Sequence, residues 1–186
     1  MHSESGKIIG LKEFLSNPIF DNCESISFNW LMYSDNNLLH YDKRPLIERF
    51  PVPNNNDEAN KFVKSIIRGN INKIPFFPKQ SSHKPDQSYI QCDSNGQTLD
   101  SGSPDCIEPP RLDKAYLKHF NTKTAEEYVE KIKKGNLCHE VYDVEERIQC
   151  FFSHNEYSDE KLKIFENAFN KNLEQNKDMY KSLYNK

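Results

Sequence analysis

Apolar and polar residues alternate most clearly between residues 25 and 33, where the order is Ser-Ile-Ser-Phe-Asn-Trp-Leu-Met-Tyr. A period of two places every second side chain on one face, so this segment is predicted to form a half-buried β-strand. The apolar face carries Ile26, Phe28, Trp30 and Met32. The turn-forming run Ser-Asp-Asn-Asn follows at residues 34–37, and residues 38–41 are then expected to return as the second strand of a hairpin.

Shorter β-rich segments follow, separated by prolines and turn residues. We expect strands over residues 62–67, 89–92 and 115–120. The sequence Asp-Ser-Asn-Gly at residues 93–96 predicts a tight turn. Residues 46–50 are enclosed by Pro45 and Pro51 and are predicted to be a short extended piece.

Helical spacing takes over after residue 120. Thr124 and Glu127 have the spacing of a capping box and Gly135 provides a stop, so the residues between them are predicted to form a helix. Further helices are expected over residues 10–15, 142–152 and 159–184. The last of these is charged over much of its circumference, so we expect it to lie on a surface or to fray. Short strands followed by helices predict a fold between α/β and α+β.

The composition narrows the class of protein. The 186 residues fit one domain, and apolar residues make up 35%, below the roughly 45–50% of an average globular chain. The 25 Lys and Arg residues against 28 Asp and Glu give a net charge of −3, which provides no general attraction to nucleic acid. No apolar run is long enough to span a membrane, and the first residues lack a signal-peptide pattern. We therefore expect no transmembrane segment and a cytoplasmic or membrane-associated chain.

The five cysteines are irregularly spaced, at positions 23, 92, 106, 138 and 150. An odd number without a Cys-x-x-Cys pair does not form a disulfide framework, so we expect buried or free thiols. His139 directly follows Cys138, but no second pair stands at the spacing of a zinc site. Phosphate-binding loops and the motifs HExxH and GxSxG do not occur, which argues against nucleotide hydrolases, zinc proteases and α/β hydrolases.

Several polar residues stand at strand ends and helix entries, where sites form in mixed folds. They are Asn29, Glu48, Arg49, Lys64, His83, His119 and Lys123. Each also has a structural explanation, because a buried Asn is normally hydrogen-bonded, Glu and Arg neighbours often form a structural ion pair, and single histidines are often solvated. Trp30 stands on the apolar face of its predicted strand, which favours packing in the core.

Six short motifs, taken in order, resemble one family. They are Phe-Asn-Trp-Leu-Met-Tyr at 28–33, Asp-Asn-Asn at 35–37, Arg-Pro-Leu-Ile-Glu-Arg-Phe at 44–50, Val-Lys-Ser-Ile-Ile at 63–67, His-Lys-Pro at 83–85 and Ala-Tyr-Leu-Lys-His-Phe-Asn-Thr-Lys-Thr-Ala-Glu-Glu at 115–127. This order resembles the C-terminal half of a glycosyltransferase family 92 domain, over about residues 7 to 135. The chain departs from the family pattern at Tyr33-Ser34, where Phe-Gly is usual, and at Lys118, where Asn is usual.

The resemblance implies a GT-A-like fold that transfers a sugar from a nucleotide-sugar donor to a glycan or another hydroxyl acceptor, with Mn²⁺ or Mg²⁺ as cofactor. Glu48 would be the base that deprotonates the acceptor, and Arg49 would orient it or bind phosphate. The metal shell would be completed by His119. Substrate would be bound by Asn29, Lys64, His83 and Lys123. The resemblance implies no nucleic-acid partner.

The Asp-x-Asp motif of the family, which holds the metal against the donor diphosphate, does not occur in this sequence. We therefore expect residues 1–155 to be the acceptor-side part of a glycosyltransferase domain that is catalytically incomplete, lacking the donor-binding part. Residues 156–186 are expected to form a polar helical tail. The alternative is a non-enzymatic module that binds carbohydrate or a protein partner.

Overall fold

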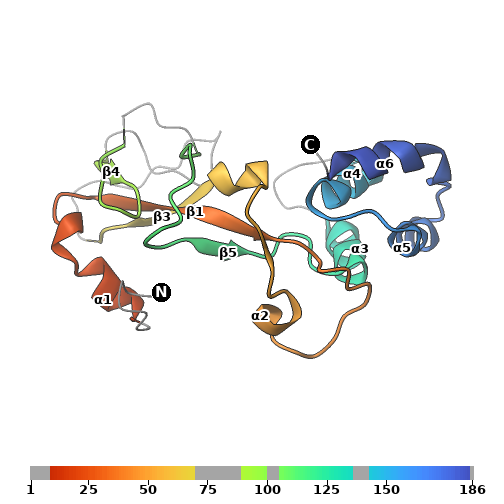
Figure 1. Ribbon diagram of the computed structural model, residues 1–186, viewed down its shortest axis with the longest axis horizontal. Coiled ribbons are helices and arrows are strands. Elements are labelled where there is room, and N and C mark those ends of the chain that lie inside the picture. The colour runs from red at the N-terminus through yellow and green to blue at the C-terminus, as the bar shows by residue number, and fades with distance from the viewer. Residues whose placement is uncertain (1–8, 70–88, 100–104, 136–142, 185–186) are drawn as a thin grey trace. The chain divides into compact units, whose positions relative to one another are not determined.

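The computed structural model describes residues 9–69, 89–99, 105–135 and 143–184 (Figure 1). These residues form a mixed sheet of five strands together with six α-helices and short 3-10 turns. The chain divides into two compact units, which we call the first unit (residues 1–32 and 55–119) and the second unit (residues 33–54 and 120–186). The expected mixture of strands and helices is confirmed, while the GT-A arrangement stays a prediction.

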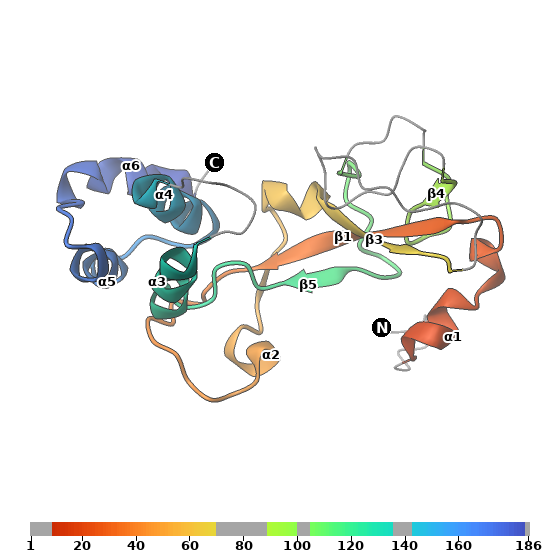
Figure 2. The same cartoon turned by 180° about the vertical axis from the view of Figure 1, so that it is seen from behind.

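The first unit is built around β1 (Ser25–Tyr33), whose bounds are those predicted from the alternating pattern. β1 pairs antiparallel with β3 (Val63–Ile67) and parallel with β4 (Gln91–Cys92) and β5 (Leu117–His119). Figures 1 and 2, which view the molecule from opposite sides, both show β3 and β5 beside β1. The fifth strand, β2 (Pro53–Asn54), is two residues long and belongs to the second unit. The strands expected over residues 62–67, 89–92 and 115–120 are confirmed as β3, β4 and β5, each shorter than predicted.

One end of the first unit holds its apolar core. α1 (Leu11–Leu15) and the 3-10 turn η1 (Pro18–Phe20) bring Phe14 and Phe20 together, with ring centroids 5.1 Å apart. Phe14 also contacts Phe28 of β1, at 6.1 Å between centroids. The core consists of Phe14, Phe20, Cys23, Ile26, Phe28, Cys92 and Ala115. This small core agrees with the low apolar content of the chain.

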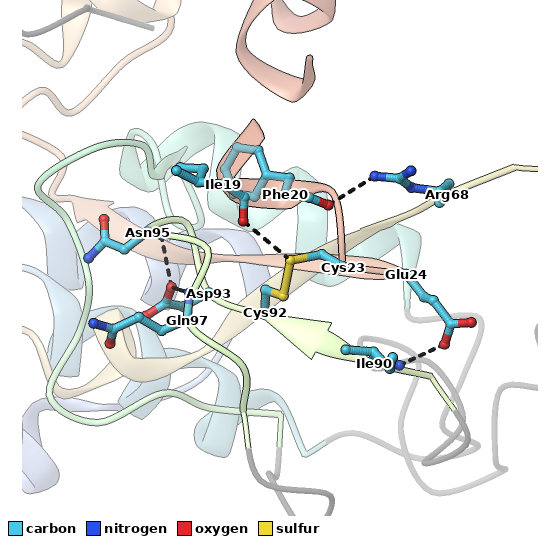
Figure 3. The surroundings of a disulfide bond; sticks show 10 residues. All are labelled: Ile19, Phe20, Cys23, Glu24, Arg68, Ile90, Cys92, Asp93, Asn95 and Gln97. Atoms are coloured by element: carbon cyan, nitrogen blue, oxygen red, sulfur yellow. Dashed lines mark hydrogen bonds between the residues drawn. A yellow bond between two sulfur atoms is a disulfide. The ribbon is translucent and has the colours of Figure 1, made fainter. Parts of the chain in front are cut away.

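Cys23 and Cys92 form a disulfide, which corrects our expectation of free or buried thiols (Figure 3). The two residues are 69 positions apart, so their spacing gives no sign of pairing. The parallel register of β1 and β4 places Ile26 opposite Cys92. Cys23, just before β1, therefore lies close to Cys92. Closing a loop of this length stabilises the folded state by roughly 4 kcal/mol in the chain-entropy description.

The predicted turn after β4 is confirmed and requires its glycine. Asp93 Oδ1 accepts hydrogen bonds from the backbone N–H groups of Asn95 and Gln97 (Figure 3). Gly96 has a φ of 81°, and a Cβ there would lie 2.6 Å from the carbonyl oxygen of Ile19. Both the left-handed backbone and the close approach of η1 favour glycine at this position.

The predicted hairpin after β1 is wrong, because residues 38–41 form no strand. Asn36 and Asn37 adopt left-handed backbone with φ of 47° and 58°, which turns the chain. The carbonyl of Leu39 then accepts a hydrogen bond from Glu126 N–H, and Glu126 Oε2 accepts one from the N–H of Tyr41. These backbone groups are satisfied at the start of a helix rather than by a neighbouring strand.

Residues 46–50 are also corrected, from an extended piece to the short helix α2 (Leu46–Arg49). Pro45 stands at its N-cap, where the carbonyl oxygen accepts hydrogen bonds from the N–H groups of Glu48 and Arg49, both near 3 Å. The residue before a proline avoids helical backbone, so Pro51 ends the helix at Phe50. The two prolines therefore enclose one turn of helix instead of an extended segment.

The helices at the C-terminal end of the second unit gather together (Figure 2), and their buried side chains form an aromatic core. Besides α2, its helices are α3 (Ala125–Lys134), α4 (Val144–His154), α5 (Asp159–Phe169) and α6 (Lys177–Leu183). The large buried side chains of the core are Tyr128, Ile148, Phe151, Phe152, Leu162, Phe165, Leu173 and Tyr180. The predicted capping box is confirmed: Thr124 accepts from Glu127 N–H, and the Glu127 carboxylate reaches back to Thr124 N–H.

The single helix predicted over residues 159–184 is instead two helices. Asn170 ends α5 in a left-handed conformation with φ of 50°, and the 3-10 turn η3 (Glu174–Asn176) leads into α6. The break lets Leu173 and Tyr180 enter the core, where both are fully buried. The segment therefore packs into the second unit instead of lying on its surface. The boundary predicted at residue 155 remains a prediction about a family domain.

Asp35 and Lys161 form a buried ion pair in the second unit. Lys161 Nζ lies 2.7 Å from the Asp35 carboxylate, and both side chains are about as buried as the aromatic core, at 1% and 2% exposed. The ammonium also donates to Asn37 Oδ1 at 2.9 Å and to the carbonyl of Glu156 at 2.6 Å. The ion pair and these two hydrogen bonds fix the turn after β1 to α5.

None of the helices in the described part of the chain is long and apolar enough to cross a membrane.

Candidate functional site

Trp30 is the centre of the most distinctive surface cluster of the first unit. The imidazole of His119 stacks on its indole with ring centroids 4.0 Å apart and planes 8° apart. The Phe62 ring lies 5.4 Å away on a tilted plane, and Lys64 Nζ lies 5.6 Å from the indole centroid. We call these four residues the Trp30 cluster. Trp30 and His119 are half-buried, and Lys64 and Phe62 are exposed.

Strand register explains why these residues meet. β5 runs parallel to β1 with Leu117 opposite Trp30, so His119 lies on the same face, two positions along. On the other side of β1, the N–H of Trp30 donates to the carbonyl of Phe62 at 2.8 Å, which places Phe62 across from Trp30. Lys64 is opposite Phe28 and therefore diagonal to Trp30 on that face.

The cluster combines aromatic rings with an ammonium group. Aromatic faces pack against apolar faces of sugars and bases, and an exposed ammonium attracts phosphate. The prediction that Trp30 lies in the core is only half right, since its side chain is half-buried between the buried Phe28 and Met32 of the same face. Phe62 was not among the predicted site residues, although the expected strand over residues 62–67 could have shown it opposite Trp30.

Asn29 lies on the other face of β1 and has a structural role. Its Nδ2 atom is within hydrogen-bonding distance of the carbonyls of Asn60, Lys61 and Ile107, at 3.0 to 3.2 Å. Its Oδ1 accepts from Arg111 N–H at 2.9 Å. The side chain is 1% exposed, so no hydrogen-bonding group remains for a substrate. The structural explanation weighed for Asn29 is therefore the one that the geometry favours.

Arg49 pairs with Glu127 instead of orienting Glu48. Its two terminal nitrogens donate to the two Glu127 oxygens at 2.7 and 3.2 Å, and Nε donates to the carbonyl of Arg44. The hydrogen bond with Glu127 raises the pKa of Arg49. Burial raises the pKa of Glu127, but hydrogen bonds from Arg49 and Thr124 outweigh it and hold that pKa below its ordinary value. Glu48 is exposed on α2.

The predicted site residues thus divide between the two units. Lys64 and His119 are brought together at Trp30, in the first unit, with Asn29 directed to the opposite face. Glu48, Arg49 and Lys123 belong to the second unit. Lys123 has a φ of 57° and immediately precedes the N-cap of α3. The prediction for His83 lies outside the described residues.

The described residues do not fit the divalent cation that the resemblance implies. Within the described ranges, no three His, Cys, Asp or Glu side chains gather as metal ligands. The ring of His119 faces Trp30, and the nearest charged group of the cluster is the ammonium of Lys64, which repels a cation. We therefore derive no chemical step through a metal at this site.

Comparison of the chain with family models, with curated proteins and with solved structures finds no match.

Proposed function

We propose that this chain is the acceptor-side part of a glycosyltransferase of the family 92 type and that the Trp30 cluster binds its nucleotide-sugar ligand. The observation that carries the proposal is that residues of separate motifs are each other's partners. Trp30 of the first motif stacks on His119 of the last one. Arg49 of the third motif pairs with Glu127 of the last one. If the motifs resembled the family only by chance, contacts between residues of different motifs would not be expected.

The charges at the Trp30 cluster favour an anionic ligand. Lys64 is exposed beside the indole, and its ammonium can bind the diphosphate of a nucleotide sugar while the aromatic rings pack against the sugar or base. Transfer would still require the cation and the Asp-x-Asp motif, which this sequence does not contain. We therefore expect this chain to bind a nucleotide sugar without transferring the sugar.

The second candidate is a module that binds a glycan without catalysis. The half-buried Trp30 and the exposed Phe62 favour it, because aromatic side chains alone can hold a neutral sugar. The two candidates differ in their dependence on Lys64: binding of a nucleotide sugar requires the ammonium, whereas binding of a neutral oligosaccharide does not.

Trp30 is the only tryptophan of the chain, so its fluorescence reports directly on the cluster. We expect uridine and guanosine diphosphate sugars to change this fluorescence in a saturable way, with free N-acetyltryptophanamide as the control for absorption by the nucleotide. Lys64→Met should weaken binding about tenfold, the loss expected when a charged partner of a phosphate is removed. Lys118→Met is the matched control, since Lys118 is exposed on β5 and alternates to the face opposite His119.

The outcomes separate the candidates. Equal binding of neutral oligosaccharides by the parent chain and by Lys64→Met would favour the glycan-binding module. No change of Trp30 fluorescence with either class of ligand at millimolar concentration would overturn both.

The disulfide adds a proposal about location. Disulfides persist in oxidising compartments and are rare in the cytosol. The Cys23–Cys92 bond therefore favours an oxidising compartment over the cytoplasmic location expected from the sequence. Alkylation of the protein from its natural source, before and after reduction, would show whether these two cysteines are paired there.

A further inference from the structure

Phe62 differs from the other phenylalanines in the described part of the chain, because its side chain is the only one of them that is exposed, at 39%. It is not an isolated surface residue, since its ring centroid lies 5.4 Å from that of Trp30. Aromatic rings contribute most of their free energy in cores and in binding interfaces. An exposed ring that belongs to an aromatic cluster is therefore a candidate for direct contact with a ligand.

The indole of Trp30, by contrast, is already covered by side chains of the protein. His119 stacks on it with ring centroids 4.0 Å apart, which leaves no room for a ligand between the two rings. Lys64 Nζ lies over the same indole, 5.6 Å from its centroid. Because β5 and β3 pair with opposite edges of β1, His119 and Lys64 reach the indole from opposite sides of that strand. Trp30 is therefore half-buried inside the cluster, whereas Phe62 is exposed at its surface.

Phe62 and Lys64 lie on the same face of the sheet. Phe62 immediately precedes β3, and its carbonyl accepts a hydrogen bond from Trp30 N–H at 2.8 Å, so it continues the pairing of β3 with β1. Residues two positions apart in an extended chain point to one face, about 7 Å from each other. Both side chains are exposed. A ligand that contains a ring and a phosphate can therefore pack its ring on Phe62 while its phosphate contacts the ammonium of Lys64.

We infer that Phe62, rather than Trp30, is the surface on which a ring of the ligand packs, and that Phe62 and Lys64 together select a ring that carries a phosphate. The inference rests on the proposed binding of a nucleotide sugar and names the side chain that holds its ring. The indole of Trp30 then acts through Phe62, as a positioning residue that supports the exposed ring from within the cluster.

The test measures binding of uridine diphosphate glucose to the full chain by isothermal titration calorimetry, which does not depend on Trp30 fluorescence. Phe62→Leu keeps an apolar side chain but removes the flat ring, and it should weaken binding about tenfold, as the loss of a stacking platform does. Phe62→Tyr keeps the ring and should restore most of the affinity. Tyr116→Leu is the matched control and should bind like the parent chain, since Tyr116 is an aromatic residue of the first unit with an exposed fraction of 38%.

Fragments of the ligand show which ring packs on Phe62. Uridine monophosphate contains the base without the sugar, and glucose 1-phosphate contains the sugar without the base. We expect the loss caused by Phe62→Leu to persist with at least one of these two fragments. Inorganic phosphate has no ring, so its binding should not depend on Phe62. A loss with neither ring-containing fragment, or an equal loss with inorganic phosphate, would overturn the inference.

Trp30→Phe separates the roles of the two rings. It keeps an aromatic contact with His119 and should weaken the binding of uridine diphosphate glucose less than Phe62→Leu does. Circular dichroism spectra equal to that of the parent chain confirm that the variants are folded. A larger loss with Trp30→Phe than with Phe62→Leu, or equal binding by Phe62→Leu and the parent chain, would overturn this inference and leave the proposed function standing. Absence of binding by the parent chain would overturn both.

Discussion

The two units of this chain reach stability by different means. The first unit has a small core of three phenylalanines and a few aliphatic side chains, and a disulfide ties the start of its central strand to β4. The second unit has no disulfide among its described residues and buries two tyrosines and three phenylalanines, together with the ion pair of Asp35 and Lys161. In the first unit, the disulfide thus contributes stability that the second unit obtains from its larger aromatic core.

The two units also differ in where their charged side chains lie. In the first unit, aromatic and charged side chains remain at the surface around Trp30, where a ligand can reach them. In the second unit, the buried charged side chains pair with each other or with a neighbour, as Arg49 does with Glu127 and Lys161 with Asp35.

The largest effect should follow from removal of the disulfide. The double variant Cys23→Ser and Cys92→Ser should lower the free energy of unfolding by about 4 kcal/mol, because the long loop is no longer closed in the unfolded chain. Urea denaturation followed by Trp30 fluorescence measures the first unit directly. Cys106→Ser, which removes a free cysteine of the same unit, should change little. Equal stability of the double variant and the parent chain would remove the contrast between the units.

The next effect should follow from breaking the buried ion pair of the second unit. Lys161→Met leaves the Asp35 carboxylate buried without its partner and should cost about 3 kcal/mol. Thermal denaturation followed by circular dichroism of the helices is the measurement. Lys163→Met, at an exposed position of α5, is the control. A loss no larger than that of the control would mean that Asp35 is satisfied without Lys161.

A smaller, pH-dependent effect is expected at Glu127. Its pKa is lowered in the folded state, so its contribution to stability is present above the ordinary pKa of 4.5 and is lost as the pH falls through the folded value. Glu127→Gln should cost about 2 kcal/mol at pH 7 and flatten the fall of stability in acid. Glu130→Gln, at an exposed position of α3, should keep the acid dependence. Identical acid profiles for the parent chain and Glu127→Gln would contradict this role.

The smallest effect tests the sheet of the first unit. Ser27 and Ser65 face each other on β1 and β3, with their hydroxyl oxygens 2.8 Å apart. Ser65→Ala should cost about 1 kcal/mol, because Ser27 is buried and loses its partner. A double-mutant cycle with Ser27→Ala, measured by urea denaturation, should show coupling between the two sites. Strict additivity would show that the hydrogen bond contributes nothing.

Local signals predicted some of the regular elements and missed others. The period of two over residues 25–33 gave the exact range of β1, and the Thr124–Glu127 capping box located the start of α3. These features depend on neighbours within a few positions, so the sequence pattern contains them. The disulfide and the return of residues 38–41 to the start of α3 could not be predicted, since they join residues dozens of positions apart.

The candidate site was predicted only in part for the same reason. His119 and Lys64 were singled out as polar residues on strands, but only the pairing register shows that both meet Trp30. The role of Arg49 depends on Glu127, which is 78 positions away. Sequence neighbours suggested a Glu48–Arg49 unit, whereas the fold pairs the guanidinium with a carboxylate that the capping box had already oriented.

The hydrogen bonds of the Asn29 amide limit which natural substitutions the protein can tolerate at this position. Aspartate has the same shape and is one nucleotide change away, yet it would turn an oxygen toward carbonyls that now receive hydrogen bonds, those of Asn60, Lys61 and Ile107. Asn29→Asp therefore hardly changes the size of the side chain, but it buries an uncompensated charge that strongly destabilises the fold. Natural variants of this protein should keep asparagine at position 29 even where the residues around it drift.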